Sequence, residues 1–307
     1  MPEPIILDCD PGHDDAIALL LALASPEVEL LGVTTTYGNQ TLEKTTGNAL
    51  RVLELVGRTD VPVAVGAERP LERELVVAAH IHGESGLDGP VLPEPTTSPA
   101  TLDAVALIAD RVAAADRPVT IVPTGPLTNV ARYLEAHGRA GLERVVLMGG
   151  SIAEGNVTPA AEFNVWCDPE AAARVFASGL DVTMVGLDVT HKAILGPTVE
   201  EQLRAAGRIG VFVGELNRFF SRYHAETYGW EGAPIHDAVA VAHVVRPGLV
   251  ETRLRNVEVE CDSELCRGRT VVDLWRRTDR VPNAHVAVDL DAVGFFDLLV
   301  ERIARLG

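Results

Sequence analysis

The sequence predicts an α/β fold: an open, mainly parallel, doubly wound sheet with helices on both faces. Two features predict it. Short runs rich in Val, Ile and Leu alternate along the chain with helical patterns, and these runs are apolar throughout rather than at every second residue. A strand that is apolar throughout is buried on both faces, which is typical of parallel sheets covered by helices. The composition, 47% hydrophobic and 23% charged, is that of a globular chain.

The predicted elements follow one another as strand and helix pairs in the first part of the chain. We expect these pairs at Ile5–Leu7 and His13–Ser25, Leu30–Thr36 and Thr41–Val56, Val119–Pro123 and Leu127–Ala136, and Arg144–Met148 and Pro169–Ser178, followed by a strand at Asp181–Leu187. After Pro197 we expect helices at Thr198–Tyr228 and His236–Val245, strands at Leu254–Glu260, Arg269–Leu274 and Ala284–Asp289, and a closing helix at Asp291–Leu306. Without a repeat or a low-complexity linker, residues 1–307 are expected to form one domain.

The charge balance restricts the class of partner. The chain has 26 Lys and Arg against 44 Asp and Glu, a formal net charge of −18, which disfavours nucleic acids and anionic membranes. A small neutral or cationic substrate, or a divalent metal, fits better. The apolar stretch Ala16–Ala24 is too short to cross a bilayer and has no basic segment before it, and the four cysteines form no dense disulfide pattern. We therefore expect a cytoplasmic protein.

Polar and small residues follow the predicted strands at the points where the strands end. These groups are Asp8–Asp10, Tyr37–Asn39, Pro123–Gly125, Gly149–Ser151 and Leu187–Asp188. In open α/β sheets, ligands bind beyond the carboxyl ends of the strands, so parallel strands would bring these groups to one edge. The sequence therefore predicts a single site there.

The segment Asp8–Asp15, which reads Asp-Cys-Asp-Pro-Gly-His-Asp-Asp, has four carboxylates within eight residues. Asp14 or Asp15 could simply cap the helix that begins here, because acidic residues favour helix starts. One cap needs only one carboxylate, however, and four so close together repel one another unless a cation or a proton compensates. Oxygen ligands favour Ca²⁺ or Mg²⁺ over zinc. The segment thus predicts a site for a hard divalent ion.

This segment resembles the N-terminal signature of the nucleoside hydrolases of the inosine-uridine-preferring type. Further matching motifs lie at residues 34–39, 80–83, 122–129, 147–150, 155–164 and 235–237, so the resemblance extends from residue 5 to about residue 245. It implies an enzyme that hydrolyses the N-glycosidic bond of purine and pyrimidine ribonucleosides, such as inosine and uridine, to ribose and free base in nucleoside salvage. It also implies a homo-oligomer, a dimer or a tetramer.

The resemblance implies a Ca²⁺ site formed by Asp10, Asp15, Asp237 and the main-chain carbonyl of Thr124, with water and the ribose 2′ and 3′ hydroxyls completing the coordination. The metal would lower the pKa of the bound water, and Asp10 would take its proton as water attacks the anomeric carbon. The other side chains implied to contact the substrate are Asp14, Asn39, Met148, Asn156, Glu162, Phe163 and Asn164. If residues 162–164 are extended, the side chains of Glu162 and Asn164 point the same way. Asn156 and Asn164 could instead serve as loop caps.

The departing base needs a proton, and His236 next to Asp237 is the candidate acid. Three glycines at positions 83, 86 and 89 suggest a mobile flap that carries His82 over the sugar and base. His224 and Tyr228 recur at four-residue spacing with Phe220 and could line the base pocket, while Phe220 fits a core position better.

Other interpretations remain open. Asp8 and Asp10 could be the Asp-x-Asp pair of a Mg²⁺-dependent phosphatase, although the lysine that would clamp the phosphate is not evident and the net charge opposes such a substrate. The chain could also be a nucleoside- or Ca²⁺-binding module without catalysis. A zinc site at His80 and His82 with Glu84 lacks a further ligand at suitable spacing. The base preference is not determined by the sequence.

Overall fold

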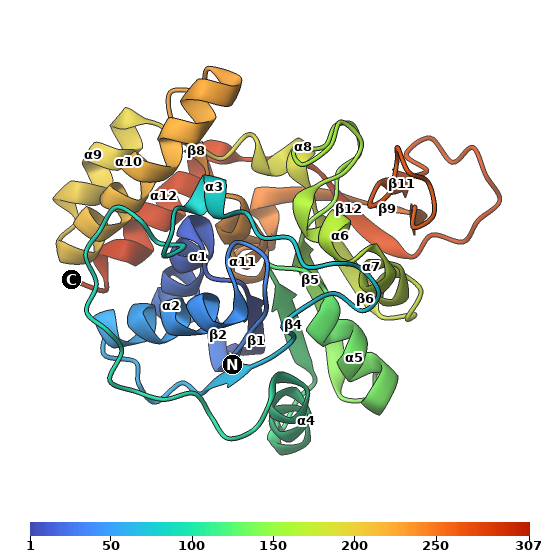
Figure 1. Cartoon of the computed structure of the whole chain (residues 1–307), viewed down its shortest axis with the longest axis horizontal. Coiled ribbons are helices and arrows are strands. Elements are labelled where there is room, and N and C mark those ends of the chain that lie inside the picture. Colours follow the sequence, from blue (N-terminus) through green and yellow to red (C-terminus); the bar gives the residue numbers. More distant parts are fainter.

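The computed structural model describes residues 1–307 and has an eight-stranded sheet at its centre (Figure 1). All neighbouring strands are parallel except the last pair, which is antiparallel. The strands in sheet order are β3 (Val63–Val65), β2 (Val28–Thr35), β1 (Glu3–Cys9), β4 (Val119–Pro123), β5 (Leu142–Met148), β6 (Asp181–Val185), β12 (Ala284–Leu290) and β9 (Val250–Arg255). The predicted α/β class with a mainly parallel sheet is confirmed.

The strand order reverses at β1, which makes this the point where a ligand crevice is expected. Leu7 of β1 pairs with Val33 of β2 on one side and with Val122 of β4 on the other. The chain therefore leaves β1 and β4 toward opposite faces of the sheet, and the loops after the two strands diverge. The segment that begins at Asp8 and the segment that ends at Thr124 flank this opening.

Two layers of helices cover the sheet. One layer contains α1 (His13–Ala24), α2 (Leu42–Leu55), α9 (Pro197–Ala205), α10 (Arg208–Tyr228), α11 (His236–Val245) and α12 (Ala292–Ala304), and the other contains α4 (Ala104–Ala114), α5 (Thr128–His137) and α7 (Pro169–Phe176). Ile5 and Leu7 of β1 belong to the first apolar core and Ile6 to the second. In Figure 1, α1 and α2 lie on one side of the strands, and α5 and α7 on the other.

Helices α1 and α11 contact each other in the first layer, and both are buried almost completely. Their sequences, HDDAIALLLALA and HDAVAVAHVV, are apolar on all sides after the first turn, as expected of helices within a core. Each helix begins with His followed by Asp. Because the two helices start at the same end of the sheet, the polar first turns meet there and the apolar remainders pack below them.

Several predicted boundaries were wrong. The helix expected at Thr198–Tyr228 is two helices, α9 and α10, because the chain turns at Gly207, whose φ of 119° suits glycine alone. The strand expected at Leu254–Glu260 is divided between β9 and β10 (Val257–Val259). Strand β10 leaves the central sheet and pairs with β11 (Thr270–Val272) in a separate antiparallel ribbon. Helix α4 and strand β3 were not predicted.

Short elements complete the end of the sheet where the strands point. They are α3 (Ala79–His82), α6 (Phe163–Cys167), α8 (Leu187–Thr190) and the ribbon of β7 (Ile194–Leu195) and β8 (Ala233–Pro234). The ribbon connects the segment after α8 to the start of α11. None of the helices combines the length and the apolar character needed to span a membrane.

Candidate active site

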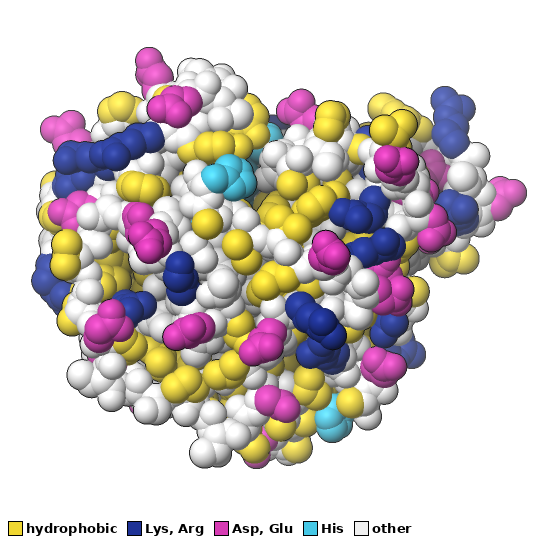
Figure 2. Space-filling model, viewed as in Figure 1, with side chains coloured by type: hydrophobic (Ala, Val, Ile, Leu, Met, Phe, Trp, Pro, Cys, Tyr) yellow, Lys and Arg dark blue, Asp and Glu magenta, His cyan; other side chains and the backbone are white.

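A pocket of about 320 Å³ opens at the carboxyl end of the sheet. In Figure 2, histidine side chains lie beside a hollow in the surface, in the part of the view that α3 and α8 flank in Figure 1. Of the residues predicted to form the site, the pocket is lined by Asp14, Asn39, His82, Thr124, Met148, Asn156, Glu162, Phe163, Asn164, His224, Tyr228, His236 and Asp237. Asp10 and Asp15 are fully buried rather than part of the lining. The predicted residues therefore converge at one place.

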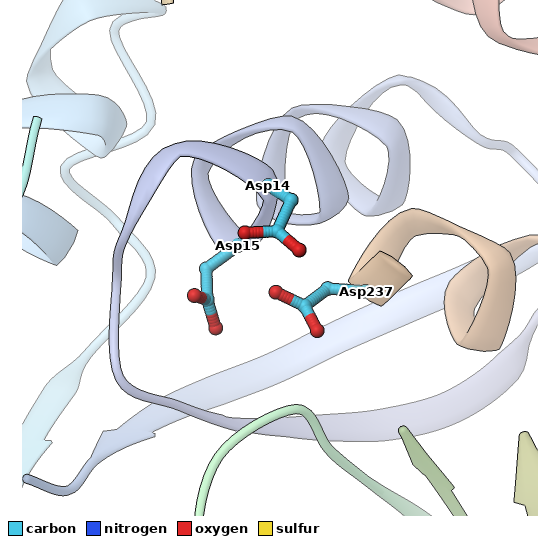
Figure 3. Close-up of side chains that lie close together, drawn as sticks. All are labelled: Asp14, Asp15 and Asp237. Atoms are coloured by element: carbon cyan, nitrogen blue, oxygen red, sulfur yellow. The ribbon is translucent and has the colours of Figure 1, made fainter. Parts of the chain in front are cut away.

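Three buried carboxylates form an acidic cluster at the floor of the pocket. Asp14 and Asp15 come from the first turn of α1 and Asp237 from the first turn of α11, and their carboxylates point toward one another (Figure 3). One oxygen of each lies within 4.8 Å of the others. The contact between α1 and α11 thus assembles three carboxyl groups from two distant parts of the chain.

Asp10 and Thr124 adjoin this cluster through Asp15. The Asp15 carboxylate accepts hydrogen bonds from the Thr124 hydroxyl at 2.8 Å, from the Asn39 side-chain amide at 2.8 Å and from the main-chain N–H of Asp10 at 3.3 Å. One oxygen of Asp10, Oδ2, accepts a hydrogen bond from the main-chain N–H of Asn39 at 2.6 Å. Its other oxygen, Oδ1, is buried and has no hydrogen-bond partner. A buried carboxylate oxygen without a donor is costly unless a cation or a proton reaches it.

The electrostatics of the cluster favour a cation. Burial, and next the charge of Asp15, raise the pKa of Asp14 to about 8. Burial, together with the neighbouring carboxylates, also raises the pKa of Asp10 and of Asp237 well above the usual value for Asp. These carboxylates are therefore costly to ionise together without a positive charge. The donor set consists of oxygen atoms alone and includes the unpartnered Asp10 Oδ1, which fits a hard divalent ion. Such an ion would supply the positive charge that allows the carboxylates to ionise together.

Glu162 and Asn164 occupy the start of a helix, so the prediction that they belong to an extended segment was wrong. Glu162 precedes α6 and caps it, accepting hydrogen bonds from the main-chain N–H groups of Asn164 and Val165 at 2.9 and 3.2 Å. Asn164 donates from its side-chain nitrogen to the carbonyl oxygen of Thr124 at 2.8 Å. Burial raises the pKa of Glu162 to about 7. Both side chains line the pocket, but the turn of a helix rather than a strand brings them there.

Asn156 serves as a loop cap, which is one of the two roles predicted for it from the sequence. Its side-chain oxygen accepts a hydrogen bond from the main-chain N–H of Phe163 at 2.9 Å. The side chain still lines the pocket, so the cap and a contact with a ligand are compatible.

His236 is buried at the first position of α11, and its Nδ1 lies 2.7 Å from the hydroxyl of Thr190 at the end of α8. Burial, and then the proximity of His191 and His224, lower the pKa of His236 well below its usual value. The ring is therefore neutral in the free protein near neutral pH. The Thr190 hydroxyl fixes the orientation of the ring toward the pocket.

The predicted flap carries His82 at the end of α3 and turns at Gly83, Gly86 and Gly89, all with positive φ. His82 is buried over the start of α1, where a Cβ added to Gly12 would approach its Nδ1 to 2.5 Å. Only a glycine at position 12 leaves room for this ring.

Helix α10 supplies the opposite wall of the pocket. The rings of Phe220 and His224 are 4.6 Å apart, and those of Tyr228 and Trp230 are also 4.6 Å apart. Phe220 is buried, as its core interpretation predicted, and also lines the pocket.

Some strand-end residues lie outside the pocket. The Tyr37 hydroxyl lies 3.1 Å from the Thr128 hydroxyl, and the Asp188 carboxylate accepts hydrogen bonds from the main-chain N–H groups of Ile152 and Ala153. These side chains support the loops of the site. The sequence analysis also missed seven lining residues, which are Val76, Val77, Ala78, Ile81, Val157, His191 and Tyr223. The spacing of three residues from Phe220 could have identified Tyr223, whereas no pattern marks Val76 and Val77.

Comparisons with known proteins identify the family of the chain. The model of a family described as inosine-uridine preferring nucleoside hydrolase matches residues 5–297. A pyrimidine-specific ribonucleoside hydrolase RihA of Shewanella sp. (strain MR-4) is 52% identical over 308 residues, which cover 99% of this chain and 97% of that protein. The RihA of Escherichia coli O81 (strain ED1a) is also 52% identical, with 99% of each chain covered. The structure of a purine-preferring ribonucleoside hydrolase from Gardnerella vaginalis superimposes with a TM-score of 0.93 and 36% identity over 99% of both chains.

Proposed function

The chain belongs to the inosine-uridine preferring nucleoside hydrolase family and is a ribonucleoside hydrolase, and from this premise we propose that it hydrolyses pyrimidine ribonucleosides with Ca²⁺ in the acidic cluster. One observation carries the proposal. Asp14, Asp15 and Asp237 converge within 4.8 Å at the floor of a pocket that histidines line on its other walls. This arrangement offers, within one pocket, a site for a cation that can bind a sugar diol and side chains that can donate a proton to a base.

Asp10, Asp15, Asp237 and the carbonyl oxygen of Thr124 would hold the ion. The unpartnered Asp10 Oδ1 and the hydrogen bond between Thr124 and Asp15 support this ligand set. When bound, Ca²⁺ supplies a hard Lewis acid that orients a diol and lowers the pKa of water. Asp14 and Asn164 then bind ribose hydroxyls, while Asn39 holds the Asp15 carboxylate in place.

Two side chains move protons in this scheme. Asp10, with one oxygen free of the protein, takes the proton of the attacking water. His236, once protonated in the complex with substrate, donates that proton to the departing base, since a base that leaves as an anion is a poor leaving group; its lowered pKa makes the protonated ring a strong acid. Met148, Asn156, Glu162 and Phe163 enclose the sugar, and His82, His224 and Tyr228 face the base.

The preference for pyrimidines rests on the relatives. The proteins described as pyrimidine-specific are 52% identical to this chain over nearly its whole length, whereas the purine-preferring hydrolase is 36% identical. We infer further that residues 1–307 act as one catalytic domain in a cytoplasmic homo-oligomer, a dimer or a tetramer, that serves nucleoside salvage.

A reducing-sugar assay tests the proposal. The purified protein with Ca²⁺ is given uridine, cytidine, inosine and adenosine, and release of ribose from uridine and cytidine at much higher kcat/KM is the expected result. Higher kcat/KM for inosine would contradict the pyrimidine preference. Release of phosphate from nitrophenyl phosphate with Mg²⁺ but no ribose from any nucleoside would favour the phosphatase interpretation. If the protein releases no ribose at saturating Ca²⁺ and does not hydrolyse nitrophenyl phosphate, the result would favour a binding module without catalysis.

A further inference from the structure

Three consecutive carbonyl groups of the flap, at residues 83–85, accept hydrogen bonds from side chains at the start of α2. These side chains recur at four-residue spacing and form one row, which consists of Gln40, Lys44 and Asn48. The Nε2 of Gln40 donates to the carbonyl oxygen of Gly83 at 2.9 Å and to that of Glu84 at 3.1 Å. The Nδ2 of Asn48 donates to the third carbonyl oxygen at 2.9 Å. The row therefore holds the flap through its main chain.

The Gln40 amide is buried, and its orientation is fixed. Its Oε1 accepts a hydrogen bond from the main-chain N–H of Thr41 at 3.2 Å, so its NH₂ end faces the two flap carbonyls. No other group of the protein donates to the Gly83 carbonyl. Lys44 is partly exposed and shares the Glu84 carbonyl with Gln40. Loss of the Gln40 amide therefore leaves one carbonyl without a donor, whereas loss of the Lys44 ammonium group does not.

The held carbonyls come directly after His82 in the chain. His82 ends α3, and Gly83 turns the chain after it with a φ of 77°. The other end of α3 is tied to the same part of the chain, because the N–H of Ala78 donates to the carbonyl oxygen of Gly38 at 3.0 Å. Residues 38–40 thus hold α3 at both ends. A helix of four residues has too few internal hydrogen bonds to be stable alone, so these ties set its position.

We propose that Gln40 is a positioning residue that holds the end of α3 and thereby keeps the His82 ring in the pocket. The ring lines the pocket and is buried, with its centroid 5.0 Å from that of Phe220 on α10. A displacement of the Gly83 carbonyl from α2 displaces His82 too, since the two residues are adjacent in the chain. The effect on the ligand rests on the proposed function, in which His82 faces the base, whereas the hold on the flap follows from the contacts alone.

Two substitutions of Gln40 remove the donor, and a substitution of Lys44 is the matched control. Gln40→Met keeps the length of the side chain without a polar group, and Gln40→Glu keeps its shape but places an oxygen against the two carbonyls. Lys44→Met removes a donor to the Glu84 carbonyl, which retains its bond to Gln40. The main chain is unaltered in all three variants, so the contacts of Asn39 with the buried carboxylates remain.

Hydrogen exchange of the full chain with Ca²⁺, followed by mass spectrometry, tests the hold on the flap. The N–H groups of residues 81–83 donate to carbonyl oxygens one turn earlier and so report on α3. We expect them to exchange about tenfold faster in Gln40→Met and Gln40→Glu than in the native protein and in Lys44→Met, with β4 and α11 unchanged. Native rates at α3 in the Gln40 variants overturn the proposal, as does faster exchange throughout the chain, which indicates a loss of global stability. If Gln40→Met fails to fold, Gln40→Glu decides.

A double-mutant cycle shows whether Gln40 acts through His82. Gln40→Met is expected to raise KM for uridine about tenfold with little change in kcat, because the His82 ring no longer keeps its place against the base. In a His82→Ala background, the same substitution is expected to change KM by less than about twofold. An equal rise of KM in both backgrounds contradicts the positioning role, and so does a rise that accompanies a loss of bound Ca²⁺. If the native protein hydrolyses no nucleoside, the proposed function fails, and the exchange rates at α3 still decide whether Gln40 holds the flap.

Discussion

The Nδ1 of His236 lies 2.7 Å from the hydroxyl of Thr190, and this contact joins the first residue of α11 to the last residue of α8. Both side chains are buried. The hydroxyl is the hydrogen-bond partner of Nδ1 within the protein, so Nε2 is left for the substrate. The general acid proposed for the departing base is therefore oriented by a residue that does not line the pocket.

Removal of that hydroxyl should lower catalysis more than binding. Thr190→Val keeps the shape of the side chain, frees the His236 ring, and is expected to lower kcat for uridine roughly tenfold, the equivalent of about one hydrogen bond. Thr190→Ser retains the hydroxyl and is the matched control, with kcat expected near the native value. Steady-state kinetics of the three proteins provide the measurement. Equal kcat values in Thr190→Val and the native protein would contradict the orienting role.

The metal proposal predicts that activity and stability depend on the same ion. Since Asp10, Asp15 and Asp237 are buried together, removal of Ca²⁺ by a chelator should abolish ribose release and lower the melting temperature, and added Ca²⁺ should restore both. Calorimetry and the reducing-sugar assay on one preparation provide the measurement. A protein free of divalent metal that retains full activity would exclude the proposed ligand set.

Much of the fold was predictable because strands that are apolar throughout leave a clear signal. The run at Val119–Pro123 and the helix that starts at His236 were predicted at the observed residues, since burial on all sides dictates their composition. Strand β10 was misjudged because only Asn256 separates it from β9 in the sequence, and only tertiary pairing distinguishes the sheet from the ribbon.

The site residues were predictable to the extent that a sequence motif carries them. Asp14 and Asp15 belong to an acidic segment, and their proximity to Asp237 follows once α1 and α11 begin at the same end of the sheet. The role of Thr190 was not predictable, because it acts through a contact between segments distant in the chain. Spacing along a helix or a strand gives no signal for such pairs.

The proposed contacts with the sugar predict discrimination against 2′-deoxynucleosides. If the ion and the side chains of Asp14 and Asn164 are organised around both ribose hydroxyls, a missing 2′ hydroxyl leaves buried polar groups unpaired. The cost of unpaired buried groups is typically about 1–3 kcal/mol each, so kcat/KM for deoxyuridine should fall by one or more orders of magnitude relative to uridine. Parallel assays on uridine and deoxyuridine test this. Comparable kcat/KM values would refute the ribose contacts.

His243 predicts a component of acid sensitivity that is independent of the active site. The ring is buried on α11, its Nδ1 has no hydrogen-bond partner, and burial lowers its pKa to about 4. Between pH 6.5 and pH 4 the unfolded chain protonates this histidine, whereas the folded protein keeps it neutral. The free energy of unfolding is therefore unaffected by His243 above about pH 6.5 and decreases as the pH falls from there toward 4.

The stability lost through His243 between pH 7.5 and pH 5 is roughly 2 kcal/mol for a shift of this size. His243→Leu should therefore lose about that much less free energy of unfolding than the native protein over this pH range, as measured by urea unfolding at both pH values. His137→Gln changes an exposed histidine and should retain the native pH dependence. An identical pH dependence in His243→Leu and the native protein would show that the His243 ring does not resist protonation.

The last prediction separates departure of the base from attack by water. If His236 protonates the leaving base, His236→Ala should slow uridine hydrolysis by roughly 10² to 10⁴, as is typical when a positioned general acid is removed. A nitrophenyl riboside has a leaving group that needs no proton, so the same variant should hydrolyse it nearly as fast as the native protein. Asp10→Ala removes the proposed base and a metal ligand, and should abolish both reactions.

Equal losses on both substrates in His236→Ala would instead mean that His236 supports its neighbour Asp237 and the metal site. Unchanged turnover of uridine would assign the acid to another wall of the pocket, where His224 and Tyr228 lie with their rings 6.0 Å apart. His82, which lines the pocket from the flap, is a further alternative. Comparison of the two substrates across His236→Ala and His224→Ala therefore identifies which element provides the proton, α11 or α10.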